Sequence, residues 1–235
     1  MTEILVDVLG DIGYNIVVIA AHIIRNSNVV DAIDHWLKET LFPIPHSNTT
    51  SQKCSKIFES LKTSTRTKFF KEWITKSSFG KHVYYDLTSV STYSDEITES
   101  EDGYSRDGED LAQLNIGMFC DKEYGIPLFY ELYNGSINDK TNLPYVLQNA
   151  KLLWINDIDI IVGVGFWSPE SFKMMDEIST LFTIGISLYH KEARKARANN
   201  TQIASDIKYG LESYNITGTF TETTIHNVCG KIALY

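Results

Sequence analysis

Cysteine and proline are both scarce in this chain of 235 residues, which contains three cysteines and five prolines. Cys54, Cys120 and Cys229 are odd in number, lie far apart and show no C-x-x-C spacing. This pattern argues against a disulfide framework and a cysteine-based zinc site, and it predicts reduced thiols in a cytoplasmic protein. The six histidines show neither H-x-H nor H-E-x-x-H spacing, so the sequence assigns no metal ion to them.

Long apolar runs are also missing. The longest run in the first 24 residues spans residues 16–21, far short of the roughly 20 residues that a membrane helix needs. The segment carries Asp7, Asp11 and His22, and it lacks the basic start of a signal peptide. We therefore expect a buried helix here, with no signal peptide and no membrane partner.

Basic residues are scarce in one part of the chain. Residues 81–150 contain 13 acidic and 4 basic side chains, and this excess equals the net charge of −9 of the whole protein. An acidic protein is in general a poor ligand for nucleic acids, because phosphate contacts need lysine and arginine. A solvated acidic loop is the commoner explanation of such a block.

Aromatic residues, by contrast, are plentiful: 11 Phe, 13 Tyr and 4 Trp can build a sizeable core. Residues 1–79 show helical periodicity. Over residues 51–61 one apolar stripe is formed by Cys54, Ile57, Phe58 and Leu61. A further helix is predicted over residues 65–76, where basic residues alternate with aromatic residues that belong more often to a core than to a base-stacking surface.

From residue 82 the periodicity changes to that of strands and helices in alternation. Three strands are predicted, then a helix, a continuous apolar strand, a helix and a fifth strand, at residues 82–92, 111–121, 126–135, 142–153, 157–165, 168–179 and 181–188. The order β-β-β-α-β-α-β predicts a mixed five-stranded α/β sheet with helices on its faces. It resembles the order of ribonuclease-H-like domains, in which the first strand is central and the fourth lies beside it in parallel.

Several ordered motifs resemble one protein family. Residues 84–94 read "YYDLTSVSTYS", and residues 103–148 begin "GYSRDGEDLAQ" and continue through "YNGS". Together they resemble the catalytic domain of insertion-sequence transposases of the DDE type, which carry Tyr-Asp-hydrophobic-Thr on the first strand and a Gly-Tyr-x-Arg-Asp-Gly loop. The resemblance extends from about residue 50 to at least residue 197.

This resemblance implies a domain organisation and a reaction. It implies a helical region and candidate DNA-binding region at 1–79, an incomplete ribonuclease-H-like catalytic domain at 80–204, and the start of a truncated β-rich insertion at 205–235. The family transfers DNA strands with Mg²⁺ held by two Asp and one Glu, since hard cations prefer oxygen ligands and two metals clamp the attacking and leaving oxygens. Asp86 matches the first catalytic, metal-binding carboxylate.

The other two carboxylates have no counterpart. "VGVGFWS" aligns with the family's second motif, and Gly163 stands where the second Asp is expected. Asp159 lies four residues back, roughly 13 Å along a strand, whereas a two-metal site spans about 4 Å. Glu170 is expected in the first turn of the next helix, facing solvent. No match to the Glu signature occurs, so we predict no phosphoryl transfer and no productive Mg²⁺ binding.

Basic residues give the candidate DNA contacts. By the same resemblance these are Arg106, Lys191, Arg194 and Lys195. The last three lie on one face of a helix predicted at residues 191–200, with Arg197 beside them. Two alternatives stay open: a solvated helix face, and an ion pair between Arg106 and Asp107 or Glu109.

Three functions follow from these observations. The first is a degenerate, truncated transposase whose partner is transposon-end DNA. The second is a non-catalytic module that binds DNA through its helical region or associates with an intact transposase. The third is a ribonuclease-H-like domain with an unrelated role. We also expect self-association, because an uncovered apolar sheet face favours it.

Overall fold

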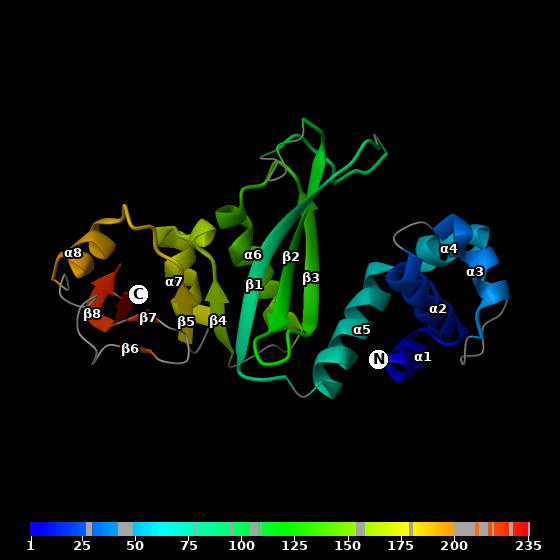
Figure 1. Cartoon of the computed structure of the whole chain (residues 1–235), viewed down its shortest axis with the longest axis horizontal. Helices are drawn as coiled ribbons and strands as arrows, with labels where there is room; N and C mark the ends of the chain where they lie inside the picture. The colour runs from blue at the N-terminus through cyan, green and yellow to red at the C-terminus, as the bar shows by residue number, and fades with distance from the viewer. Residues whose placement is uncertain are drawn as a thin grey trace. The chain divides into compact units, whose positions relative to one another are not determined.

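The computed structural model describes residues 1–26, 30–41, 49–77, 79–94, 96–103, 108, 110–153, 158–178, 181–199, 210–211, 216–217, 219–225 and 228–234 (Figure 1). The chain forms two compact units, Met1–Ser78 and Phe79–Tyr235. The first unit is helical and the second contains the sheet.

The helical unit confirms the helical periodicity of its sequence. Its elements are α1 (Thr2–Leu9), α2 (Asp11–Asn26), the short 3₁₀ turn η1 (Val30–Ala32), α3 (Ile33–Glu39), α4 (Ser51–Ser60) and α5 (Thr63–Lys76). The single helix expected at the N-terminus is in fact two helices. The chain breaks at Gly10, whose φ of 61° is a conformation that glycine adopts without steric cost.

No single helix among the described residues has the length and apolar composition of a membrane span. The segments Asp11–Arg25 and Val30–Glu39 reach such a length only when they are taken together, and they are bent by 113° relative to each other.

The buried face of helix α4 is narrower than the sequence predicts. One buried cluster of the helical unit consists of Val18, Ile19, Ile33, Cys54 and Ile57. Of the stripe predicted on α4, Phe58 and Leu61 are 49% and 37% exposed, so that part of the prediction is wrong. The buried side of this ten-residue helix consists of Cys54 and Ile57 alone. Burial, assisted by the charge of Asp34, raises the pKa of the Cys54 thiol and keeps it protonated.

The second unit contains the predicted mixed sheet. Its first elements are β1 (His82–Ser91), β2 (Gln113–Asp121), β3 (Pro127–Asn134), α6 (Asp139–Leu152), β4 (Asp159–Val162), the 3₁₀ turn η2 (Val164–Phe166), α7 (Pro169–Ile178), β5 (Leu181–Ile184) and α8 (Lys191–Asn199). The strand order is β3-β2-β1-β4-β5. The first three strands are antiparallel neighbours, and β4 runs parallel to both β1 and β5. This is the predicted ribonuclease-H-like arrangement, with β1 in the centre (Figure 1).

Two antiparallel strand pairs follow α8 among the described residues, in the segment 205–235 that was expected to be rich in β structure. They pair β6 (Gly210–Leu211) with β7 (Ile216–Thr217), and β8 (Thr219–Ile225) with β9 (Val228–Leu234). Ile225 is buried with Phe172 and Ala196, so β8 packs near α7 and α8.

Strand β1 has one buried and one open face, since successive side chains of a strand point to opposite sides. The buried side chains are those of Val83, Tyr85 and Leu87. On this face the ring of Tyr85 lies 4.7 Å from that of Phe119 and 5.2 Å from that of Phe166. Asp86 lies on the opposite face and is exposed.

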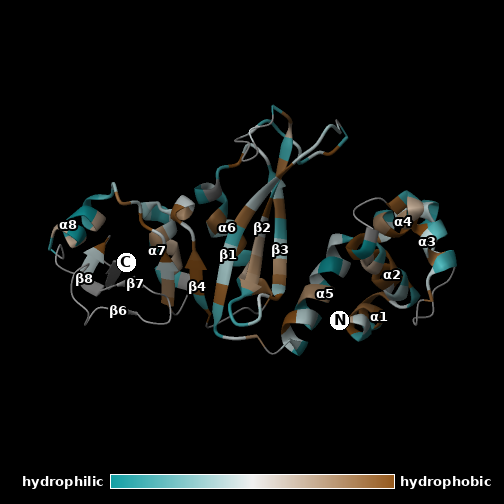
Figure 2. Cartoon of the chain, viewed as in Figure 1, coloured by the Kyte–Doolittle hydropathy of each residue, from teal (hydrophilic) through white to brown (hydrophobic). Residues whose placement is uncertain are grey.

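Strand β4 and helix α7 begin and end for local reasons. Figure 2 shows β4 as strongly hydrophobic, as expected for a central strand covered on both faces. The strand ends at Val162, earlier than its apolar run, because the chain turns through η2. Helix α7 starts as predicted: the Ser168 hydroxyl accepts a hydrogen bond from the backbone N–H of Ser171 at 3.0 Å, and Pro169 takes the first helical position.

Candidate functional site

Asp86 lies in the middle of β1, on its exposed face. Its Oδ1 accepts a hydrogen bond from the backbone N–H of Leu87 at 2.8 Å. Its partner across the antiparallel pair is Met118. The carboxylate is therefore solvated and available, and the fold does not use it as a buried ion.

Gly163 directly follows β4 and lies opposite Asp86 of the neighbouring strand β1. The parallel register places Tyr85 opposite Val162, so Asp86 and Gly163 are the next residues on the two chains. The backbone of Gly163 is extended, with φ −71° and ψ 172°, which any residue can adopt. A Cβ at this position would meet no atom within 4 Å. The backbone thus presents a vacant side-chain position beside the carboxylate of Asp86.

The other acids that were weighed lie elsewhere. Asp159 is 6% exposed and pairs with Lys81 Nζ at 3.4 Å and His82 Nδ1 at 3.3 Å. Its register partner is His82, the first residue of β1, four residues before Asp86. Glu170 is exposed in the first turn of α7. Neither acid occupies the place opposite Asp86.

These residues do not fit the Mg²⁺ pair that the family resemblance implies. A two-metal clamp needs several carboxylate oxygens converging on two ions about 4 Å apart. In the part of the chain that the structure describes, no three His, Cys, Asp or Glu side chains are grouped closely enough to hold a metal ion. Asp86 supplies one carboxylate, and Gly163 has no side-chain oxygen to supply a second.

Three of the predicted basic residues, Lys191, Arg194 and Lys195, are exposed on helix α8. Arg106 lies outside the described residues. Lys195 Nζ bonds Glu192 Oε1 on its own helix at 3.2 Å. Lys191 is exposed at the first position of α8.

Arg194 also lines a cavity of about 520 Å³ beside α8. The cavity is lined by Leu188, Tyr189, Arg194, Arg197 and Ala198. Tyr189 is 89% exposed and Leu188 is 63% exposed. Among the described residues, neither arginine forms an ion pair. Two cationic side chains and an accessible aromatic ring therefore share one hollow.

Of these lining residues, Arg197 was expected beside the basic face of the helix, whereas Tyr189 was not predicted from the sequence. The available signal was the sequence "LYHKEARKAR" at residues 188–197, in which an aromatic residue directly precedes a basic helix. Figure 2 shows this helix as mainly hydrophilic.

A carboxylate of the acidic segment holds the loop after β1 in place. Glu101 pairs by a backbone bridge with Gln113. Its side chain accepts hydrogen bonds from Ser136 Oγ and, at 2.6 Å, from Asn134 Nδ2. These hydrogen bonds, that of Ser136 first, lower the pKa of the Glu101 carboxyl from its ordinary value. The Glu101 side chain in this acidic block is thus a structural contact between the loop and the end of β3.

This contact predicts a pH dependence. Because the pKa of Glu101 is lowered on folding, its contribution is complete above the ordinary Glu pKa and is lost as the pH falls through the lowered value. We expect Ser136→Ala to destabilise the chain at about pH 7 and to differ much less from the unchanged protein at about pH 3, measured by urea unfolding. Ser55→Ala, at an exposed position of α4, is the control and should give no pH-dependent difference. A Ser136→Ala effect that is equal at both pH values would contradict the role of the Glu101 charge.

Comparison with known proteins gives structural similarities only. No protein-family model matches the sequence, and no curated protein matches it. A piggyBac transposase synaptic complex with hairpin DNA has 13% sequence identity and a TM-score of 0.46, over 90% of this chain and 47% of that one. A Mos1 transposase paired-end complex with the left transposon end has 10% identity and a TM-score of 0.32, over 82% and 71%. A Mos1 mariner paired-end complex with Mn has 12% identity and a TM-score of 0.31, over 81% and 67%.

The chain therefore spans just under half the length of the piggyBac transposase to which it is similar. The assignment of the ribonuclease-H-like fold depends on the strand order and register given above rather than on these similarities.

Proposed function

We propose that this chain derives from a DDE-type insertion-sequence transposase and binds DNA without cutting it. The observation that carries the proposal is the register that places Gly163, directly after the end of β4, opposite Asp86 in the middle of the parallel neighbour β1. In an in-line phosphoryl displacement, carboxylates at two such facing positions share divalent ions that stabilise the attacking and leaving oxygens. A glycine has no side-chain oxygen, so a shared ion would lack its second carboxylate ligand.

The motifs of residues 84–94 and 103–148 support the proposed descent. The first places Asp86 on the central strand, and the second covers β2, β3 and most of α6. The loop of the second motif, at residues 103–108, lies largely outside the described residues. The proposal therefore combines a sequence pattern with a strand register that the pattern alone does not contain.

A strand-cleavage assay tests the loss of catalysis. We expect no Mg²⁺- or Mn²⁺-dependent nicking of a supercoiled plasmid that carries the DNA flanking the gene. Asp86→Ala is the matched variant and should be indistinguishable from the unchanged chain. Turnover that needs a divalent metal and disappears in Asp86→Ala would refute the proposal.

The helical unit offers a second route to the same DNA. Its helices α4 and α5 expose the basic side chains of Lys53, Lys56, Lys68 and Lys71. This favours the alternative in which the chain acts as a DNA-binding or interaction module derived from a transposase. Replacing these four lysines by glutamine should weaken a gel shift and reduce its salt dependence, because each neutralised phosphate contributes about −0.9 to the slope of log K against log salt on duplex DNA.

A further inference from the structure

The cavity beside α8 has the chemistry of a nucleotide site. It is an open hollow of about 520 Å³ lined by exposed side chains, and not an enclosed pocket. Arg194 and Arg197 are three residues apart on a helix, so their Cβ atoms are neighbours at about 5–6 Å. Two guanidinium groups at this spacing suit a phosphate, which accepts bidentate hydrogen bonds. The exposed ring of Tyr189 and the side chain of Leu188 supply an apolar wall.

The chain that leads to the cavity leaves the sheet at the edge where β4 ends and Gly163 follows. Strand β5 is parallel to β4 and ends at Ile184, opposite Val162. The next residue, Gly185, donates its backbone N–H to the Val162 carbonyl at 3.1 Å. A Cβ on Gly185 would lie 2.7 Å from the Val164 nitrogen, so the chain that leads to Tyr189 starts tightly packed against the turn after Gly163.

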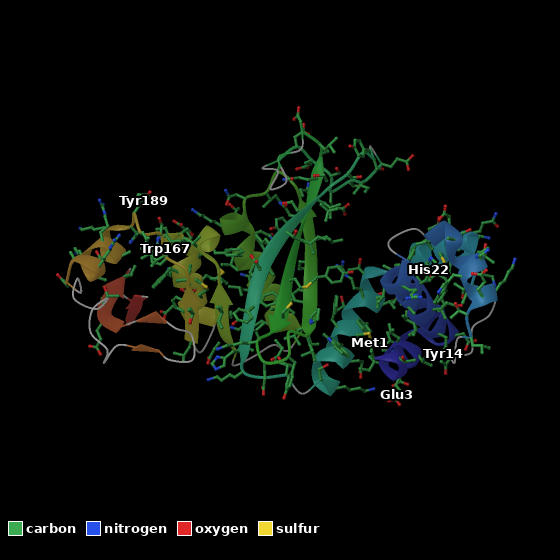
Figure 3. All side chains as sticks on the ribbon, viewed as in Figure 1. Met1, Glu3, Tyr14, His22, Trp167 and Tyr189 are labelled. Atoms are coloured by element: carbon green, nitrogen blue, oxygen red, sulfur yellow. The ribbon has the colours of Figure 1, made fainter. Side chains whose placement is uncertain are left out.

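Aromatic contacts fix the far end of this connection. The ring of His190 lies 4.8 Å from that of Trp167 in an edge-to-face arrangement, and Trp167 lies 5.5 Å from Phe172. Figure 3 shows Trp167 and Tyr189 in the region between α7 and α8. Tyr189 directly precedes His190, and its ring is therefore carried on an anchored backbone while remaining 89% exposed.

We infer that this cavity holds one unpaired nucleotide of a DNA strand, with the base against Tyr189 and a phosphate between Arg194 and Arg197. The inference rests on the proposed function, because DNA binding supplies the ligand. An unpaired strand is favoured over a duplex because a duplex keeps its base faces stacked and offers nothing for the exposed ring to contact. Proteins that bind single strands combine a basic groove with aromatic rings on which bases stack.

Fluorescence anisotropy of the full chain with a labelled dT12 strand tests the stacking contact. Tyr189→Ala should reduce the affinity for dT12 by about 5- to 150-fold, which is the loss of one base–aromatic stack. Tyr189→Phe keeps the ring and should change the affinity less than about twofold. Because the side chain is exposed, neither variant should alter the urea unfolding midpoint.

The arginines have a separate readout. Arg194→Ala combined with Arg197→Ala should lower the slope of log K against log salt by about 0.7, because both side chains contact the same phosphate and one neutralised phosphate contributes roughly 0.7 on a single strand. Lys173→Ala is the control, since this lysine is exposed on α7 beside Glu177 and does not line the cavity.

The outcomes separate the two levels of the argument. The same measurement is made with dT12 annealed to its complement. If the chain binds either DNA, but neither Tyr189→Ala nor the double arginine variant weakens the binding of dT12, the nucleotide cavity is refuted and the proposed function stands. If the chain binds no DNA in either form, the proposed function fails and the cavity loses its ligand.

Discussion

The variant Gly163→Asp is expected to bind Mn²⁺ roughly tenfold or more tightly than the unchanged chain, because divalent-ion affinity rises with the number of charged oxygen ligands. The backbone permits the change without strain. Residue 163 has extended dihedral angles, and a Cβ built there meets no atom within 4 Å. The new carboxylate would stand beside Asp86 on the adjacent parallel strand, so two acids would converge on one ion.

Titration of Mn²⁺ followed by electron paramagnetic resonance measures this gain directly. Asp86→Ala in the Gly163→Asp background should abolish the gain, whereas the same substitution in the unchanged chain should have little effect. Val164→Asp is the matched control, because it adds the same charge one residue further on, at an exposed position within η2. Equal Mn²⁺ affinity in the Gly163→Asp and Val164→Asp chains would show that position 163 is not opposite Asp86.

The sequence was informative where a local pattern determines the structure. The strand-forming residues of 82–92 placed Asp86 on a strand, and the Ser-Pro pair placed the start of α7. The resemblance of the element order to ribonuclease-H-like domains predicted that this strand is central and that the fourth strand lies beside it. The register that brings Gly163 level with Asp86 depends on pairing between distant segments, and only the structure supplies it.

Helix α8 shows why the sequence did not pair Arg194 with Arg197. Helical spacing placed Lys191, Arg194 and Lys195 on one face, but the helix buries only Ala193 and Ala196. A stripe of two alanines leaves a wide exposed arc, and several groupings of the charged residues fit that arc equally well. Lys195 forms an ion pair with Glu192, whereas Arg194 and Arg197 line the cavity.

The chain break at Gly10 has a similar origin. The apolar pattern of the first 24 residues continues across this glycine and gives no reason to stop a helix there. A glycine inside a helical pattern is tolerated at a cost of about 1 kcal/mol, so its presence alone does not predict a break. Helix α1 ends where Gly10 takes a φ of 61°, after its backbone N–H has donated to the Val6 carbonyl at 2.8 Å.

Phe119→Ala is expected to lower the free energy of unfolding by about 3–5 kcal/mol, the usual cost of removing a buried aromatic ring. The ring of Phe119 is fully buried, 4.7 Å from that of Tyr85 and 5.4 Å from that of Phe129. It therefore joins the three antiparallel strands at the centre of the sheet. Phe119→Leu retains most of the volume and should cost less than about 1.5 kcal/mol.

Urea unfolding of the full chain compares these variants with a matched truncation. Tyr145→Ala removes an aromatic ring from α6 that is 64% exposed, and it should change the free energy of unfolding by less than about 0.5 kcal/mol. Tyr85 also contacts Phe166, which ends the turn that follows Gly163. The same cluster of rings thus packs beneath both parts of the candidate site, the segment of β1 around Asp86 and the turn after Gly163. If Phe119→Ala were no more destabilising than Tyr145→Ala, the ring cluster would not be the core of this sheet.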